Sequence, residues 1–171
     1  MRTRCSLVLA LVVALALPLI AQSGGEKTVR STDGLLQLSV PESWGDQELN
    51  EAAEVQIGNE EQSAYLIVLI EKKEDLFGWN LDRHSRVTLG TLLSSVDLPK
   101  IVGPKSMKVG SWPAVQYEIR GAAGGSNIVY LHTTIETPEL FVQALAWTLP
   151  SKEAAIRKQL EKAVLSIRPV E

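Results

Sequence analysis

The sequence predicts an α+β domain whose central, mostly antiparallel sheet packs between helices. Three apolar segments follow one another with short joins: Ala114–Arg120, Asn127–Glu136 and Phe141–Leu149. Parallel neighbours need a crossover of a dozen residues or more, so these segments must be antiparallel neighbours. The run Tyr65–Ile70 is apolar without alternation, which indicates a strand covered on both faces. Strands outnumber helices and the helices come separately, which is typical of an α+β fold.

The chain begins with a predicted signal peptide, residues 1–23. Two arginines precede the apolar run Leu7–Ile20, which is shorter than the roughly 20 residues that a membrane span needs. Cleavage is expected after one of two small residues, Ala21 or Ser23; the alternative is an uncleaved anchor. The sequence therefore predicts a periplasmic or secreted protein, with no stable membrane insertion after cleavage.

Cysteine content and charge exclude several classes of function. Cys5 is the only cysteine and lies before the apolar run, so the mature chain has no thiol for a disulfide, a nucleophile or a metal site. The net charge is −3, and removal of the two leader arginines makes it two units more negative. An acidic chain without a basic stripe argues against nucleic acid as a partner.

The first half of the mature chain is predicted to be mainly strands. Residues 24–32 are polar and are predicted to be a linker, so that the single domain spans residues 33–171. Leu35–Val40 alternates and is stopped by a proline, as an edge strand would be. Glu54–Ile57 is a second short strand, and Ser63–Glu71 contains the buried apolar run.

The second half adds two helices around the three-strand meander. Asn80 is a predicted N-cap, and Pro99 ends the helix that follows. Ser106–Val109 is predicted to be a short strand. The glycine-rich join 121–126 suits a hairpin loop, and Pro138 suits the turn after it. The last helix is predicted to be capped by Ser151 and carries one apolar stripe, formed by Ile156, Leu160, Ala163, Val164 and Ile167.

Catalytic and metal-binding patterns are not found. His132, Thr134 and Glu136 can share one face of a strand and could hold a metal, but a histidine hydrogen-bonded within the sheet is the preferred interpretation. His84 is expected at the surface. The sequence contains neither H-E-x-x-H nor G-x-S-x-G. We therefore predict no catalytic residue, no cofactor and no metal.

The aromatic residues give the candidate binding site. Trp147 is predicted to lie in the core, and Trp44 to cover an edge of the sheet. Phe77, Trp79 and Trp112 lie beside glycine-bearing turns, and exposed aromatic side chains are frequent anchors at partner surfaces. These three are the predicted partner-binding residues. The alternative is that they close the ends of the core.

Several segments together carry a family resemblance: Asp33-Gly34, Val40-Pro41-x-x-Trp44, Gln56–Asn59 leading into Tyr65–Glu71, Pro113–Tyr117, Ile128–Tyr130 and Gln143–Thr148. In these segments the sequence resembles the PsbP-like family. The resemblance covers about Asp33 to Ile167. The family includes a thylakoid photosystem subunit, a Ran-binding Mog protein and bacterial exported proteins. The resemblance implies an α/β/α sandwich, a binding or scaffolding role, and no shared active site.

The sequence thus predicts an exported, non-enzymatic binding or scaffold protein of the bacterial envelope. Its partner would be an unknown protein or a small apolar ligand. Two alternatives stay open: a hydrolase with an unrecognised polar pocket, and an accessory subunit of a larger envelope complex.

Overall fold

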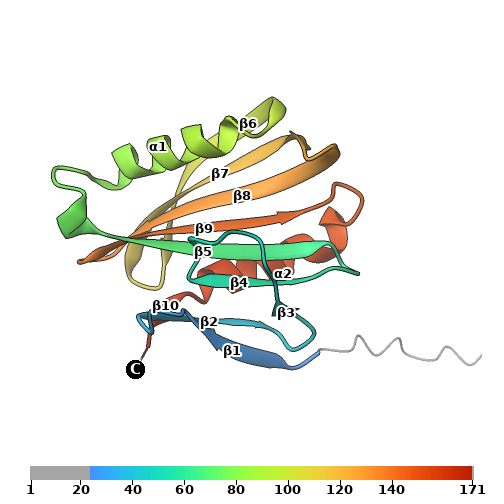
Figure 1. The fold of residues 1–171 in the computed structure, drawn as a ribbon, viewed down its shortest axis with the longest axis horizontal. Helices are drawn as coiled ribbons and strands as arrows, with labels where there is room; N and C mark the ends of the chain where they lie inside the picture. Colours follow the sequence, from blue (N-terminus) through green and yellow to red (C-terminus); the bar gives the residue numbers. More distant parts are fainter. Residues whose placement is uncertain (1–23, 171) are drawn as a thin grey trace, which may run out of the picture.

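The computed structural model describes residues 24–170, and the predicted signal peptide, residues 1–23, lies outside them. It confirms the α+β class, with two helices, a seven-stranded sheet and a three-stranded sheet (Figure 1). Along the chain the elements are β1 (Glu26–Arg30), β2 (Leu36–Pro41), β3 (Gly45–Asp46), β4 (Val55–Asn59), β5 (Ala64–Lys72), the 3₁₀ turn η1 (Lys73–Asp75), α1 (Leu81–Leu93), β6 (Asp97–Val109), β7 (Trp112–Ala123), β8 (Ser126–Glu136), β9 (Leu140–Thr148), α2 (Glu153–Leu165) and β10 (Arg168–Pro169).

The predicted meander forms the middle of the larger sheet. The strand order is β3-β4-β5-β9-β8-β7-β6, and every neighbouring pair is antiparallel. The strands β7 and β8 run further into the glycine-rich join than predicted, and only Gly124 and Gly125 remain between them. Both glycines have positive φ, +57° and +79°, as a tight hairpin turn between twisted strands requires.

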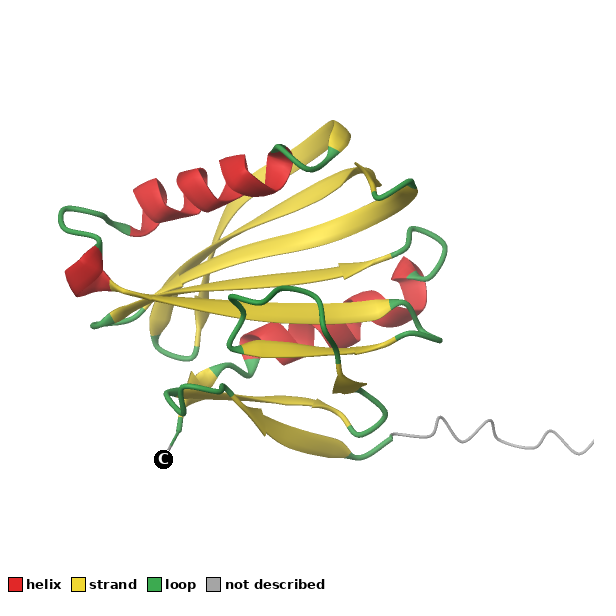
Figure 2. Cartoon of the chain, in the orientation of Figure 1, coloured by secondary structure: helices red, strands yellow, loops and turns green. Residues whose placement is uncertain are grey.

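A helix packs on each face of the larger sheet, as the run in β5 predicted. The helix α1 packs on β7, β8 and β9, whereas α2 packs on the opposite face and on β2 of the smaller sheet β1-β2-β10 (Figure 2). In β5, Leu66 and Val68 belong to the core under α2, and Ile67 belongs to the core under α1. Ile67 is only 4% exposed, so the layered arrangement is confirmed.

The prediction of a linker at residues 24–32 is wrong, because Glu26–Arg30 is strand β1. This strand pairs with β2 in antiparallel register, from Glu26 opposite Pro41 to Arg30 opposite Gln37. Its exposed and half-buried side chains alternate. An edge strand is held by main-chain hydrogen bonds and can carry polar side chains on its solvent side, so its composition gives little signal.

The predicted helix end and the short strand Ser106–Val109 also need correction. The helix α1 ends at Leu93, and β6 occupies the whole of Asp97–Val109. β6 is the outer strand of the sheet, and its pairing with β7 shifts register around Pro99 and Pro104. Proline is tolerated at such edges and bulges because its missing N–H is not needed there.

Two further details concern Trp44 and the start of α2. Trp44 directly precedes the edge strand β3, is 1% exposed and belongs to the larger core. The helix α2 has Lys152, not Ser151, at its N-cap, and no side chain caps it. Each helix has 13 residues, and neither is long and apolar enough to cross a membrane within residues 24–170.

Candidate partner-binding site

The loop between η1 and α1, residues 76–80, carries the most exposed aromatic side chain of the described chain. Phe77 is 97% exposed, and Gly78 beside it has a φ of +76°. The loop is short and closed by a hydrogen bond of 3.0 Å from the Trp79 N–H to the Leu76 carbonyl. Asn80 caps α1 as predicted, since its Oδ1 accepts from the Arg83 N–H at 2.9 Å. We call these residues the Phe77 loop.

Trp79 anchors this loop to the helix instead of facing the solvent freely. The Arg83 guanidinium lies 4.8 Å from the centre of the Trp79 ring, within range of a cation–π interaction. The ring also meets His84 edge-on, with 6.0 Å between centroids. The structure therefore gives the two predicted residues different positions: Trp79 is half-buried, and Phe77 projects from the tip.

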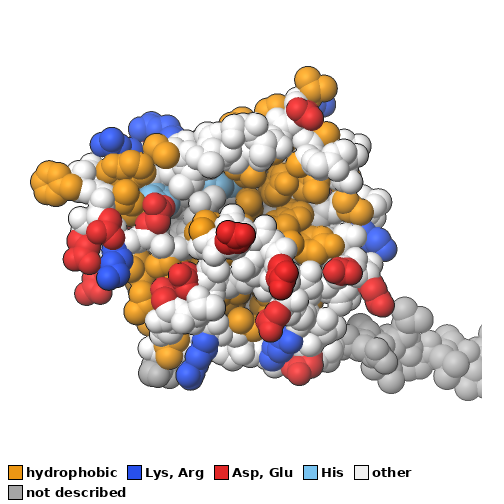
Figure 3. All heavy atoms as spheres, in the orientation of Figure 1, with side chains coloured by type: hydrophobic (Ala, Val, Ile, Leu, Met, Phe, Trp, Pro, Cys, Tyr) orange, Lys and Arg blue, Asp and Glu red, His pale blue; other side chains and the backbone are white. Residues whose placement is uncertain are grey.

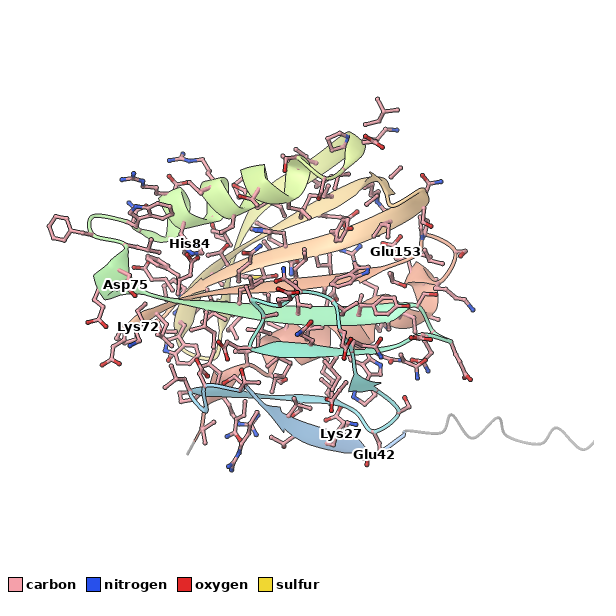
Figure 4. The ribbon with its side chains drawn as sticks, viewed as in Figure 1. Lys27, Glu42, Lys72, Asp75, His84 and Glu153 are labelled. Atoms are coloured by element: carbon pink, nitrogen blue, oxygen red, sulfur yellow. The ribbon has the colours of Figure 1, made fainter. Side chains whose placement is uncertain are left out.

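Two carboxylates from the sheet fix the base of the loop. Glu71 of β5 accepts a hydrogen bond from His84 Nε2 at 2.7 Å. Glu136 of β8 accepts from Lys73 Nζ at 2.6 Å and from the Leu81 N–H at 3.1 Å. The second contact puts negative charge at the N-terminus of α1, where the helix dipole favours it. Figure 4 shows His84 between α1 and β5, with Lys72 and Asp75 at the end of β5.

The histidines are more buried than the sequence indicated. His84 was predicted at the surface, but its exposure is 0% because it faces the sheet and stacks on Phe141 with 4.6 Å between ring centroids. His132 is also fully buried, and its Nε2 lies 3.0 Å from Thr88 Oγ1 of α1 rather than bonding within the sheet. Burial, and secondarily the nearby His84, lower the pKa of His132 to about 4.

These side chains form a buried polar cluster without access for a substrate. The cluster contains polar atoms without a hydrogen-bond partner among the described residues, namely His84 Nδ1, Ser85 Oγ, His132 Nδ1 and Thr134 Oγ1. His84 and His132 are each 0% exposed and Ser85 is 1% exposed, so no reacting group from solvent can reach them. Within the described residues, no three His, Cys, Asp or Glu side chains are grouped to hold a metal.

Trp112 lies on the other side of the sheet. It begins β7 and packs against the core under α2. There it lines a hollow of about 390 Å³ together with Leu35, Leu36, Thr137, Pro138, Glu139, Leu140 and Pro169. A second hollow of about 590 Å³ adjoins it, shares the turn Pro138–Leu140, and extends to Lys72, Lys73 and Glu74.

The three predicted residues therefore lie at one end of the sheet but on two faces. The sequence predicted a turn at Pro138 but gave no sign that Pro138–Leu140 lines both hollows, and sequence reasoning missed the carboxylates that support the loop. The only sequence signal for these carboxylates was the spacing that places His132, Thr134 and Glu136 on one strand face. The groups that meet here come from different elements and are far apart in sequence: Glu136 with Leu81, Glu71 with His84, and His132 with Thr88.

Comparison with known proteins identifies the fold. No protein-family model matches the sequence, and no curated protein sequence matches it. Among solved structures, LpqN of Mycobacterium tuberculosis, involved in cell envelope biogenesis, has a TM-score of 0.64 at 14% identity, covering 86% of this chain and 91% of LpqN. Cyanobacterial PsbP (CyanoP) of Synechocystis sp. PCC 6803 has a TM-score of 0.61 at 12% identity, covering 91% and 99%. The Ran-binding protein Mog1p of Saccharomyces cerevisiae has a TM-score of 0.58 at 14% identity, covering 87% and 97%. At such identities the likeness concerns the fold alone: the chain has the PsbP-like fold.

Proposed function

We propose that this chain is an exported, non-enzymatic binding or scaffold protein that contacts a protein partner through the Phe77 loop. The observation that carries the proposal is a phenylalanine 97% exposed at the tip of a loop whose base is fixed by ion pairs and hydrogen bonds. A fully exposed phenylalanine contributes nothing to folding by burial, yet its burial against a partner is worth about 2 kcal/mol. A rigid base lowers the entropy lost on binding.

The comparisons support this direction. Mog1p is a Ran-binding protein, and LpqN is involved in cell envelope biogenesis. A protein partner and a place in the envelope are therefore reasonable for a chain with the same fold. The complete burial of both histidines argues against the alternative of a hydrolase, because neither can meet a substrate.

The test is affinity capture from the envelope fraction of the native host with Phe77→Ala and Leu98→Ala variants. Leu98 is a matched control, since it is 91% exposed on β6, away from the loop. We expect the wild type and Leu98→Ala to recover the same protein in similar amounts, and Phe77→Ala to lose most of it. Equal recovery by all three would remove the Phe77 loop as the contact.

A small apolar ligand is a second candidate, favoured by the hollow beside Trp112. Its volume of about 390 Å³ lies in the range of small-molecule sites, and its lining is largely apolar. Native mass spectrometry of protein purified from the host would reveal such a ligand as an added mass. The mass should be lost in Trp112→Ala and kept in Phe77→Ala; a wild type without any added mass would reject this candidate.

A further inference from the structure

A strip of apolar side chains lies on the face of the larger sheet that α1 covers only in part. It contains half-buried residues of β5, β8, β9 and α1, namely Tyr65, Leu69, Ile128, Trp147, Leu92 and Leu93. We call it the apolar strip. Figure 3 shows hydrophobic side chains gathered in this region, below the polar outer side of α1.

Aromatic rings form the centre of the strip. Tyr65, Trp147 and Tyr130 occupy matching positions on β5, β9 and β8. The rings of Tyr65 and Trp147 stack with 5.4 Å between centroids, and those of Tyr130 and Trp147 are 6.0 Å apart. Beside Tyr65 on β4 lies Gly58, where an added Cβ would come within 2.8 Å of the tyrosine ring. Because glycine has no side chain, the Tyr65 ring can lie against the sheet at this position.

An acidic segment borders the strip opposite α1. Residues 46–61 contain six acidic residues and no lysine or arginine. The loop within this segment lies over the same face, because Ala53 packs into the core under α1 and Gln56 Oε1 accepts from the Leu49 and Asn50 N–H groups at 2.7 Å. The exposed carboxylates on this side form what we call the acidic rim: Glu48 and Glu51 in the loop, and Glu60 and Glu61 in the turn between β4 and β5. In residues 24–170 none of these four takes part in an ion pair.

Residues 87–96, which form the second half of α1 and the turn after it, contain no charged residue. Negative charge therefore dominates the border of the strip on the side of residues 46–61, and Figure 3 shows acidic side chains along its lower margin. A partner that buries these aromatic rings must also lie beside uncompensated carboxylates. Positive charge on the partner would be attracted to the rim, and could in addition contact the faces of the tyrosine and tryptophan rings.

From these features we propose that the apolar strip binds a basic amphipathic helix of a partner protein. Strand addition is not available, because β5, β9 and β8 are inner strands and have neighbours on both sides. A helix instead brings an apolar face to the rings and lysine or arginine side chains to the rim. A second copy of this chain is disfavoured, since a symmetric contact between strips would bring two acidic rims together. This surface is separate from the Phe77 loop and does not depend on it.

The probe is a fluorescein-labelled helical peptide of roughly 18 residues built only from leucine and lysine with amphipathic spacing. Its counterpart has glutamate in place of lysine. Fluorescence anisotropy with the full mature chain measures binding. The test variant is Glu48→Lys/Glu51→Lys, and the matched control is Glu74→Lys/Asp75→Lys, which reverses two exposed charges in η1.

We expect the leucine–lysine peptide to bind, to weaken with added salt, and to lose about tenfold or more in affinity with Glu48→Lys/Glu51→Lys. Tyr65→Ser should also weaken it, whereas the control variant and Phe77→Ala should bind like the wild type. The glutamate peptide should not bind. Absence of binding by the leucine–lysine peptide, equal binding of both peptides, or equal losses in the two charge-reversal variants would overturn the proposal. Normal peptide binding by Phe77→Ala keeps this result independent of the proposed function.

Discussion

Lowering the pH should destabilise this protein through His132. Its pKa is about 4 in the folded protein, because burial opposes the charged form, compared with 6.5 in the unfolded chain. The unfolded state therefore binds a proton first. The contribution of His132 to the free energy of unfolding is fully present above pH 6.5. It falls as the pH drops from 6.5 to 4 and changes no further below pH 4. The difference corresponds to about 3 kcal/mol.

The assay is urea unfolding at 25 °C across this pH range, for the wild type and for His132→Gln. Glutamine places an amide nitrogen near the position of Nε2 and does not titrate. Between pH 6.5 and 4 the wild type should lose about 3 kcal/mol more than the variant. Other groups, such as Glu153, whose pKa is lowered by its hydrogen bond to Arg120, titrate in both proteins and cancel in the comparison. Parallel stability curves for the two proteins would refute the role given to His132.

Three further predictions concern stability. Gly58→Ala should destabilise the protein by about 1–3 kcal/mol, because the added Cβ would lie 2.5 Å from a backbone oxygen of β5. Gly90→Ala should stabilise it by about 1 kcal/mol, because alanine favours the helix α1 and the added Cβ meets open space. Thermal unfolding of the two variants checks that the effects have opposite signs. Arg157→Gln, which breaks one ion pair from α2 to Glu118 of β7 and two ion pairs within α2, should cost about 1 kcal/mol at low salt and less at high salt, and a loss independent of salt would contradict this. Glu136→Gln should speed amide hydrogen exchange in residues 76–81 relative to the wild type, because it removes the charge that holds Lys73 and the start of α1; unchanged exchange would argue against that support.

The elements predicted well are those whose signal is local. The meander follows from two short joins, and the layered fold from the unbroken apolar run of β5. The missed strand β1 and the missed first part of β6 lie at sheet edges, where polar residues, lysines and prolines are compatible with pairing. From their composition such strands are predicted to be linkers or loops, although their backbone is hydrogen-bonded to a neighbouring strand on one side.

The candidate site was predicted only in part because its supports are not local. Phe77 could be identified as an aromatic residue beside a glycine, and its exposure agrees with that interpretation. His84 was misplaced because a histidine on a weakly amphipathic helix gives no sign of burial. Its partner Glu71 lies on a different element, and the sequence pattern cannot show that the two meet. The apolar strip likewise depends on register across three strands.

Photo-crosslinking tests the central claim most directly. A photoreactive phenylalanine analogue placed at position 77, and at position 98 in a second protein, reports which proteins touch each site in living cells of the host. Both positions are more than nine-tenths exposed, at 97% and 91%, so solvent access is matched. The binding role of the Phe77 loop predicts one discrete adduct from position 77 that is absent from position 98. No adduct at 77, or the same adducts from both positions, would contradict it.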